Sequence, residues 1–143
     1  MEEFDGSELP ARRAEFLGII AGMGGEGTTG AIAREAGVTP STATKTLSVL
    51  ADGGYIEQIP YRGVRLTPMG ERYARFLVRR HRVLSLALSR FGLSPEEACR
   101  EAKNLESHVS RELVDRICAS LGHPMQSVCG PIEHDCLCCP LRS

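Results

Sequence analysis

The sequence has no hydrophobic run of the ~18 residues that a membrane-spanning helix needs. It also lacks a basic N-terminus, since residues 1–9 carry four acidic side chains and no basic one. A secretory signal requires the opposite charge, so we expect a cytosolic protein that does not contact membranes. With 42 % hydrophobic and 24 % charged residues in 143, the composition is that of a globular chain and excludes global disorder and a coiled coil.

The chain has almost no net charge, −1 at pH 7, but its charges are unevenly distributed. Residues 61–90 carry eight arginines and one glutamate, a local charge of +7. Because the local field determines what binds a surface, a nucleic-acid partner stays possible. Four of these arginines fall on one helical stripe, which is either a solvated face or a surface for phosphates or the acidic leader: Arg72, Arg75, Arg79 and Arg82.

Hydrophobic periodicity and capping residues predict six helices. They cover about 10–23, 28–36, 39–53, 67–91, a segment opened by Ser94, and 110–122. Alternating runs at 55–59 and 63–67 predict a β-hairpin, and the prolines and glycines after 122 predict an irregular tail. We expect a mainly α fold with a small β-hairpin. Residues 1–67 would form a winged helix-turn-helix domain, 68–122 a helical domain and 123–143 a cysteine-rich irregular tail.

The third predicted helix has the small polar outer face that reading a DNA groove requires. Such side chains approach base edges closely and hydrogen-bond to bases and phosphates. Arg62, at the tip of the predicted hairpin, is placed to reach a phosphate or the minor groove. The alternative is a helical bundle with a solvated polar face. The predicted DNA contacts are Thr39, Ser41, Thr42, Thr44, Lys45, Ser48 and Arg62.

Candidate metal ligands occur on three of the predicted helices. His81 interrupts an apolar face of the long helix, and Cys99 and Glu106 lie seven residues apart on the next one. Glu15 flanks the apolar stripe of the first helix. These side chains could close around a divalent ion, although a lone histidine on an apolar face is also typical of a core residue.

Four of the six cysteines lie in the last 15 residues, with a spacing that is not the paired Cys-x2-Cys of a zinc finger. Zinc, ferrous iron or an iron–sulfur cluster would suit such thiolates better than manganese, and a thiol switch or a passive tail are the alternatives. Cys99 or His108 could add a ligand, whereas Cys118 fits an apolar core face. The candidate tail ligands are Cys129, His134, Cys136, Cys138 and Cys139.

Four segments resemble the iron-dependent repressor family: residues 32–41 (IAREAGVTPS), 61–67 (YRGVRLT), 80–82 (RHR) and 105–110 (LESHVS). The likeness covers roughly residues 14–121 and implies a dimeric, metal-activated repressor of metal-uptake genes, in a short form without the SH3-like third domain. It also implies metal ligation by Glu15, His81, Cys99 and Glu106.

The sequence departs from the family at three ligand positions. The family's Glu-His pair reads Glu106-Ser107, with a histidine one place later at His108. Lys103 stands where the family has a cysteine or glutamate, and Ser85 stands where it has a further carboxylate. A protonated lysine is no metal ligand, so the resemblance implies a reduced family site.

The function we expect is a homodimeric repressor that responds to iron(II) or manganese(II) and binds a pseudo-palindromic operator of metal-homeostasis genes. The alternative within the DNA-binding class is a redox or iron–sulfur sensor that acts through the C-terminal cysteines. An enzyme fits poorly, because no nucleophile–base pair can be placed and residues 22–30 lack the lysine of a P-loop.

Overall fold

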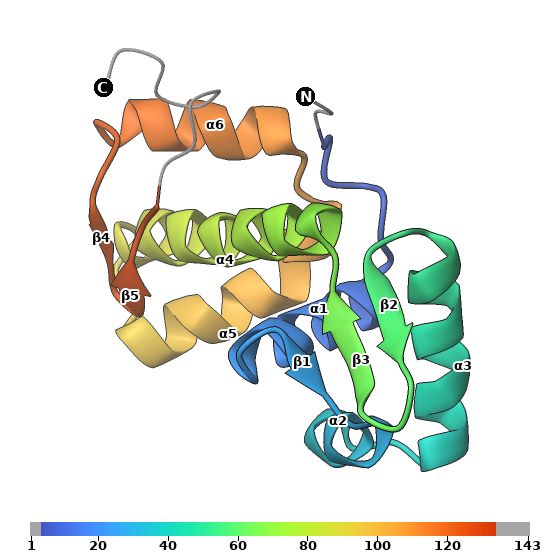
Figure 1. Cartoon of the computed structure of the whole chain (residues 1–143). Coiled ribbons are helices and arrows are strands. Elements are labelled where there is room, and N and C mark those ends of the chain that lie inside the picture. Colours follow the sequence, from blue (N-terminus) through green and yellow to red (C-terminus); the bar gives the residue numbers. More distant parts are fainter. Residues whose placement is uncertain (1–3, 134–143) are drawn as a thin grey trace. The chain divides into compact units, whose positions relative to one another are not determined.

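The computed structural model describes residues 4–133 of the chain. It confirms a mainly α fold with a small β-hairpin (Figure 1). The helices are α1 (Ala11–Gly22), α2 (Thr29–Ala36), α3 (Pro40–Asp52), α4 (Pro68–Ser89), α5 (Pro95–Leu105), the 3-10 turn η1 (Glu106–His108) and α6 (Arg111–Ser120). The strands are β1 (Glu26–Gly27), β2 (Ile56–Ile59), β3 (Gly63–Leu66), β4 (Gln126–Ser127) and β5 (Gly130–Pro131).

The chain divides into two compact units. One comprises Leu9–Leu77, and the other combines the leader up to Glu8 with the chain from Val78 onward. Helix α4 begins in the first unit and ends in the second. Within residues 4–133, no helix is both long and apolar enough to cross a membrane.

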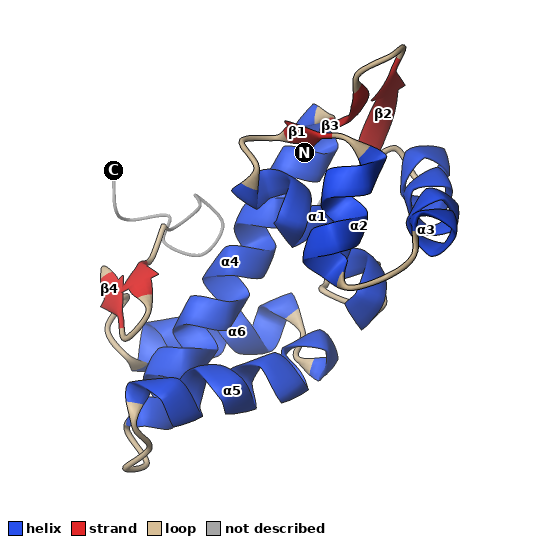
Figure 2. Cartoon of the chain, turned by 90° about the horizontal axis from the view of Figure 1, so that it is seen from below, coloured by secondary structure: helices blue, strands red, loops and turns tan. Residues whose placement is uncertain are grey.

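The first unit, Leu9–Leu77, is a winged helix-turn-helix. Helix α3 buries Ala43, Leu47 and Leu50, the inward residues that its periodicity predicts. The predicted hairpin β2–β3 gains a third strand, because β1 pairs antiparallel with β3 in the order β1-β3-β2. A two-residue strand has no periodicity to detect, so β1 was not expected. Figure 2 shows the hairpin projecting beyond the helices of the same unit.

Local sequence places α3 after a tight turn. Gly37 adopts φ 70°, a left-handed conformation that glycine adopts without steric cost, and ends α2. Two residues later Thr39 caps α3, with its hydroxyl accepting a hydrogen bond from the Thr42 N–H, and Pro40 occupies the first turn. Helix α3 therefore begins where its sequence predicts.

The second unit has its own hydrophobic core between α4, α5 and α6. Val83, Ala102 and Val114 are fully buried in it, and Cys118 joins them with no exposed surface, which confirms the prediction of a core thiol. Helix α5 begins with the predicted capping box of Ser94 and Glu97. The hydrogen bond from the Ser94 backbone lowers the pKa of Glu97, as expected for a carboxylate held in its charged form.

The segment after α6 is more regular than predicted. Strands β4 and β5 pair antiparallel within residues 126–131, and Ile132 is packed into the core of the second unit with 2 % of its surface exposed. Its N–H donates to the Met125 carbonyl at 2.9 Å. Residues 123–133 are thus a core-anchored hairpin and not an irregular tail.

The expected arginine stripe on α4 is not one solvated face. Arg79 is buried and pairs with Asp115 on α6, with Nη1 2.7 Å from Oδ1, while Arg82 donates to the Pro131 carbonyl at 2.6 Å. Only Arg72 and Arg75 remain exposed. The interpretation of a single phosphate-facing stripe is wrong because the second half of α4 packs against α6 and the β4–β5 hairpin.

Candidate metal centre and DNA interface

Three potential metal ligands converge in the second unit. His81 on α4, Cys99 on α5 and Cys129 in the turn between β4 and β5 each offer an atom, and these atoms all lie within 4.8 Å of one another. His81 and Cys99 are half-buried, and Cys129 is exposed. An imidazole and two thiols form a donor set that binds first-row divalent ions. We refer to this group as the thiol–imidazole cluster.

A carboxylate orients the imidazole. Nδ1 of His81 lies 2.8 Å from Oε2 of Glu106, so Nε2 is left for a ligand. Ser85 Oγ lies 3.4 Å from Nε2 and also hydrogen-bonds to Cys99, which places Nε2 on the side of the thiols. Metal-binding histidines commonly donate their second ring N–H to a carboxylate, which fixes the tautomer. Glu106 therefore hydrogen-bonds to His81 and is not itself a member of the cluster.

Burial raises the pKa of the Cys99 thiol, the hydrogen bond with Ser85 opposes this shift, and the neighbouring Cys129 thiol adds to it. Two thiols close together disfavour ionisation of either one. A cation between them reverses this preference, because thiolates are the forms that bind metal. Metal binding at the cluster therefore competes with protons.

The β4–β5 hairpin is held against α4 by contacts on both of its strands, and Figures 1 and 2 show it beside that helix. Arg82 donates to the Pro131 carbonyl, and Ser127 Oγ donates to the Arg82 carbonyl at 2.7 Å. Gly130 has a φ of 150°, and a Cβ there would lie 2.9 Å from the guanidinium carbon of Arg82. A glycine therefore allows this approach, which keeps Cys129 next to the helices.

The other predicted ligands are not in this cluster. Glu15, on α1 in the first unit, is exposed and pairs with Arg12 at 3.3 Å; its role as a ligand stays a prediction. His108 is exposed in η1. The remaining predicted tail ligands lie outside the described residues: His134, Cys136, Cys138 and Cys139.

Replacing Glu106 by glutamine is expected to weaken divalent-metal binding roughly 10- to 100-fold, the usual cost of losing a partner that orients a metal-binding histidine. A neutral amide is a weaker acceptor for the Nδ1–H of His81 than a carboxylate. Competition with a chromophoric chelator measures the affinity. Glu101→Gln, an exposed position on α5, is the control, and equal affinities in the two variants would contradict this role of Glu106.

The predicted recognition face of α3 is exposed in the first unit. Some of its hydroxyls are already engaged: Thr39 caps the helix, and Thr44 donates to the Pro40 carbonyl at 2.9 Å. The exposed members of the face are Thr39, Ser41, Thr42, Thr44, Lys45 and Ser48. The helix thus presents hydroxyls and one ammonium group, while Ala43, Leu47 and Leu50 are buried and Val49 is exposed.

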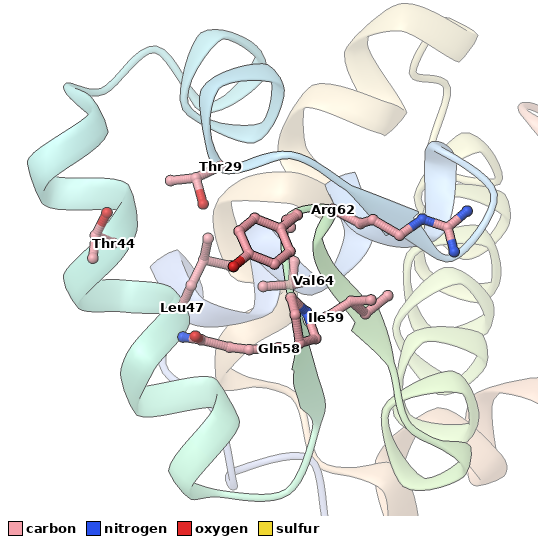
Figure 3. A pocket seen from close by; sticks show the side chains of 10 residues that line it. Thr29, Thr44, Leu47, Gln58, Ile59, Arg62 and Val64 are labelled. Atoms are coloured by element: carbon pink, nitrogen blue, oxygen red, sulfur yellow. The ribbon is translucent and has the colours of Figure 1, made fainter.

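A groove of about 380 Å³ separates α3 from the β2–β3 hairpin. Figure 3 shows Thr44 of α3 and Gln58 of the hairpin along it, with Arg62 extending away from α3. Tyr61 at the hairpin tip is fully exposed and has a φ of 64°. Gln58 and Tyr61 line this groove but were not among the predicted DNA contacts. Tyr61 could have been considered from the sequence, because it stands next to Arg62 in the predicted turn.

Family models match the two parts of the chain. The model described as the iron dependent repressor N-terminal DNA binding domain matches residues 24–64. The model described as the iron dependent repressor metal binding and dimerisation domain matches residues 67–133. The second match ends at the last described residue, after the hairpin that carries Cys129.

Curated relatives and a solved structure agree with these matches. The chain is 43 % identical to transcriptional regulator MntR of Salmonella typhimurium over 88 residues, 62 % of this chain and 56 % of that protein. It is also 43 % identical to MntR of Escherichia coli over 108 residues, 76 % of this chain and 70 % of that protein. A manganese-dependent transcriptional repressor in complex with manganese superposes with a TM-score of 0.70 at 34 % identity, covering 80 % of this chain and 54 % of that one. The chain belongs to the iron dependent repressor family.

Proposed function

We propose that this protein is a DNA-binding transcriptional repressor that responds to a divalent transition metal and controls genes of metal homeostasis. The observation that carries the proposal is the convergence of His81, Cys99 and Cys129 in the second unit, in a chain whose first unit is a winged helix-turn-helix. The names of its relatives, MntR and a manganese-dependent repressor, support the same function. The redox alternative depends on the C-terminal cysteines, and three of these, Cys136, Cys138 and Cys139, lie outside the described residues.

The donor set of the cluster fits a divalent metal. Two thiolates on one tetrahedral ion, each at ~2.3 Å, stand about 3.8 Å apart, and the three donor atoms already lie within 4.8 Å. His81, Cys99 and Cys129 would hold the ion, and Glu106 would orient His81. The bound ion supplies positive charge that offsets the repulsion between the two thiolates. Glu15 is a further proposed ligand, supported by the resemblance to the family.

The metal would act through linkage. The second half of α4 carries His81, and the first half of the same helix belongs to the DNA-binding unit. An ion that binds one arrangement of the chain more tightly than another shifts the population toward that arrangement. In a homodimer, the favoured arrangement would be the one in which two recognition helices match adjacent turns of the major groove.

Selection of duplexes from a random pool tests the function. The metal-loaded, reduced chain is expected to enrich an inverted repeat, because one recognition helix reads too few base pairs alone and a dimer reads two half-sites. The same selection with a chelator should enrich it less. A pool without any enriched inverted repeat in the presence of metal would overturn the proposed function.

Two variants of the proposed interface should weaken DNA binding in different ways. Lys45→Ala removes the one cation of the exposed α3 face and should lower specific affinity, by about 1–3 kcal/mol if Lys45 contacts a base edge. Arg62→Ala should reduce the log–log salt slope by about 0.9 if the side chain neutralises one phosphate. Titrations at several salt concentrations measure both effects. Lys103→Ala, an exposed lysine of the second unit, is the control, and an equal loss there would contradict the assignment.

A further inference from the structure

We propose that the thiol–imidazole cluster is a two-thiolate site selective for zinc or ferrous iron, and that it discriminates against manganese. This rests on the proposed function, because it names the ion that the sensing site takes. The proposal departs from the printed names of the relatives, which point to manganese. It follows from the side chains that this chain places around His81.

The donor atoms of the cluster are soft or borderline. Within residues 4–133, the group consists of one imidazole and two thiols, without a carboxylate. The Glu106 carboxylate is engaged by the histidine, with its Oε2 2.8 Å from Nδ1 of His81. Manganese favours carboxylate, carbonyl and water oxygens, whereas thiolates favour zinc and iron. The cluster therefore has the donors that manganese prefers least.

Two polar side chains of α4 and α5 add no anionic ligand to the cluster. Ser85 is fully buried, and its hydroxyl donates to the His81 carbonyl at 2.8 Å. Lys103 is exposed, and a protonated amine cannot bind a cation. The side chain one turn after His81 is therefore a neutral hydroxyl and not a carboxylate.

The site is built by three separate elements whose positions are fixed. Helices α4 and α5 share the core of the second unit, and the hairpin is tied to α4 through Arg82 and Ser127. The three donor atoms thus need only a small movement to reach the spacing of a tetrahedral zinc ion, and a fourth position stays available for water or another ligand.

Cobalt(II) is the probe for thiolate ligation. The full-length chain, reduced and stripped of metal, should develop an intense near-ultraviolet thiolate-to-cobalt band on titration with Co²⁺. Cys99→Ser and Cys129→Ser should each lose about half of this band, because each variant removes one of two thiolates. Cys118→Ser is the matched control, since that thiol is in the core and contacts His123. Circular dichroism of the metal-free variants verifies that each one is folded.

A second variant separates the cluster from the tail. Joint replacement of Cys136, Cys138 and Cys139 by serine should leave the cobalt band unchanged. A band that vanishes in this triple variant and keeps its full intensity in Cys99→Ser and Cys129→Ser would overturn the proposal. So would cobalt binding without any thiolate band.

Metal competition measures the selectivity itself. Under anaerobic conditions, zinc and ferrous iron should each displace manganese from the wild-type chain, and metal analysis of protein purified without air distinguishes these two ions. In the double variant Cys99→Asp/Cys129→Asp, the preference for zinc over manganese should fall by about tenfold or more. An unchanged preference would overturn the proposal.

These readouts are independent of DNA. If the chain binds DNA in response to manganese but shows no thiolate-to-cobalt band, the proposed selectivity is contradicted and the proposed function is not. If metal binds the two thiolates but leaves DNA binding unchanged, the proposed function is contradicted and the proposed two-thiolate site is not.

Discussion

Replacing His81 by alanine is expected to remove the metal response of DNA binding. At saturating metal, the variant should bind its operator with the affinity of the chelator-treated wild-type chain, a loss of roughly 5- to 150-fold, the range of most couplings between two sites. The reason is that His81 is both a member of the thiol–imidazole cluster and the group that Glu106 orients. Fluorescence anisotropy with a labelled duplex, with and without chelator, measures the loss.

His108→Ala is the control for this experiment. It removes the same side chain from η1, where His108 is exposed and is not a member of the thiol–imidazole cluster. The metal response of His108→Ala should match that of the wild-type chain. A response that survives in His81→Ala, or disappears in His108→Ala, would mean that the metal is held elsewhere.

Replacing Asp115 by alanine is expected to destabilise the second unit by about 3 kcal/mol, since breaking a buried ion pair by removal of one partner is strongly destabilising. Asp115 is 2.7 Å from Arg79, whose side chain is 3 % exposed, and 3.9 Å from Arg111. The effect should lie at the lower end of the range for buried pairs because Asp115 itself keeps 29 % of its surface.

Urea denaturation of the metal-free chain measures this loss. Glu112→Ala is the control, because Glu112 forms an exposed pair with Arg116 on the same helix, and such pairs contribute less than about 1 kcal/mol. Equal midpoints for the two variants would show that the pair of Arg79 and Asp115 does not stabilise the unit.

The helices were predictable because their boundaries are encoded locally. The threonine and proline before α3, the capping box of α5 and the glycine that ends α2 each act within four residues of the boundary. The apolar stripes between these boundaries repeat every three or four residues. Sequence and structure therefore agree on every long element.

The short strands were not predictable, for the opposite reason. Strands β1, β4 and β5 each span two residues, too few for an alternating pattern. They exist because of partners far away in the chain: β1 pairs with β3, and Arg82 holds the β4–β5 hairpin. Burial of Arg79 could not be predicted from the sequence either, since its partner Asp115 lies 36 residues away in the chain.

The members of the thiol–imidazole cluster were predictable from the sequence, and their grouping only in part. His81, Cys99 and Cys129 were each predicted as ligands from their chemistry. The sequence offered Cys99 or His108 as a further ligand for the tail cysteines, but it could not show that Cys129 meets both Cys99 and His81, because this depends on a hairpin with no periodic signal. Glu106 was predicted as a ligand, and its contact with Nδ1 of His81 became visible only in three dimensions.

The metal affinity of the full chain, measured with and without its operator duplex, tests the central claim most directly. If the metal favours the DNA-binding arrangement, linkage requires the duplex to tighten metal binding by the same factor by which metal tightens DNA binding. We predict equal factors in the wild-type chain and a factor of one in His81→Ala. A metal affinity that is the same with and without the operator would contradict the account.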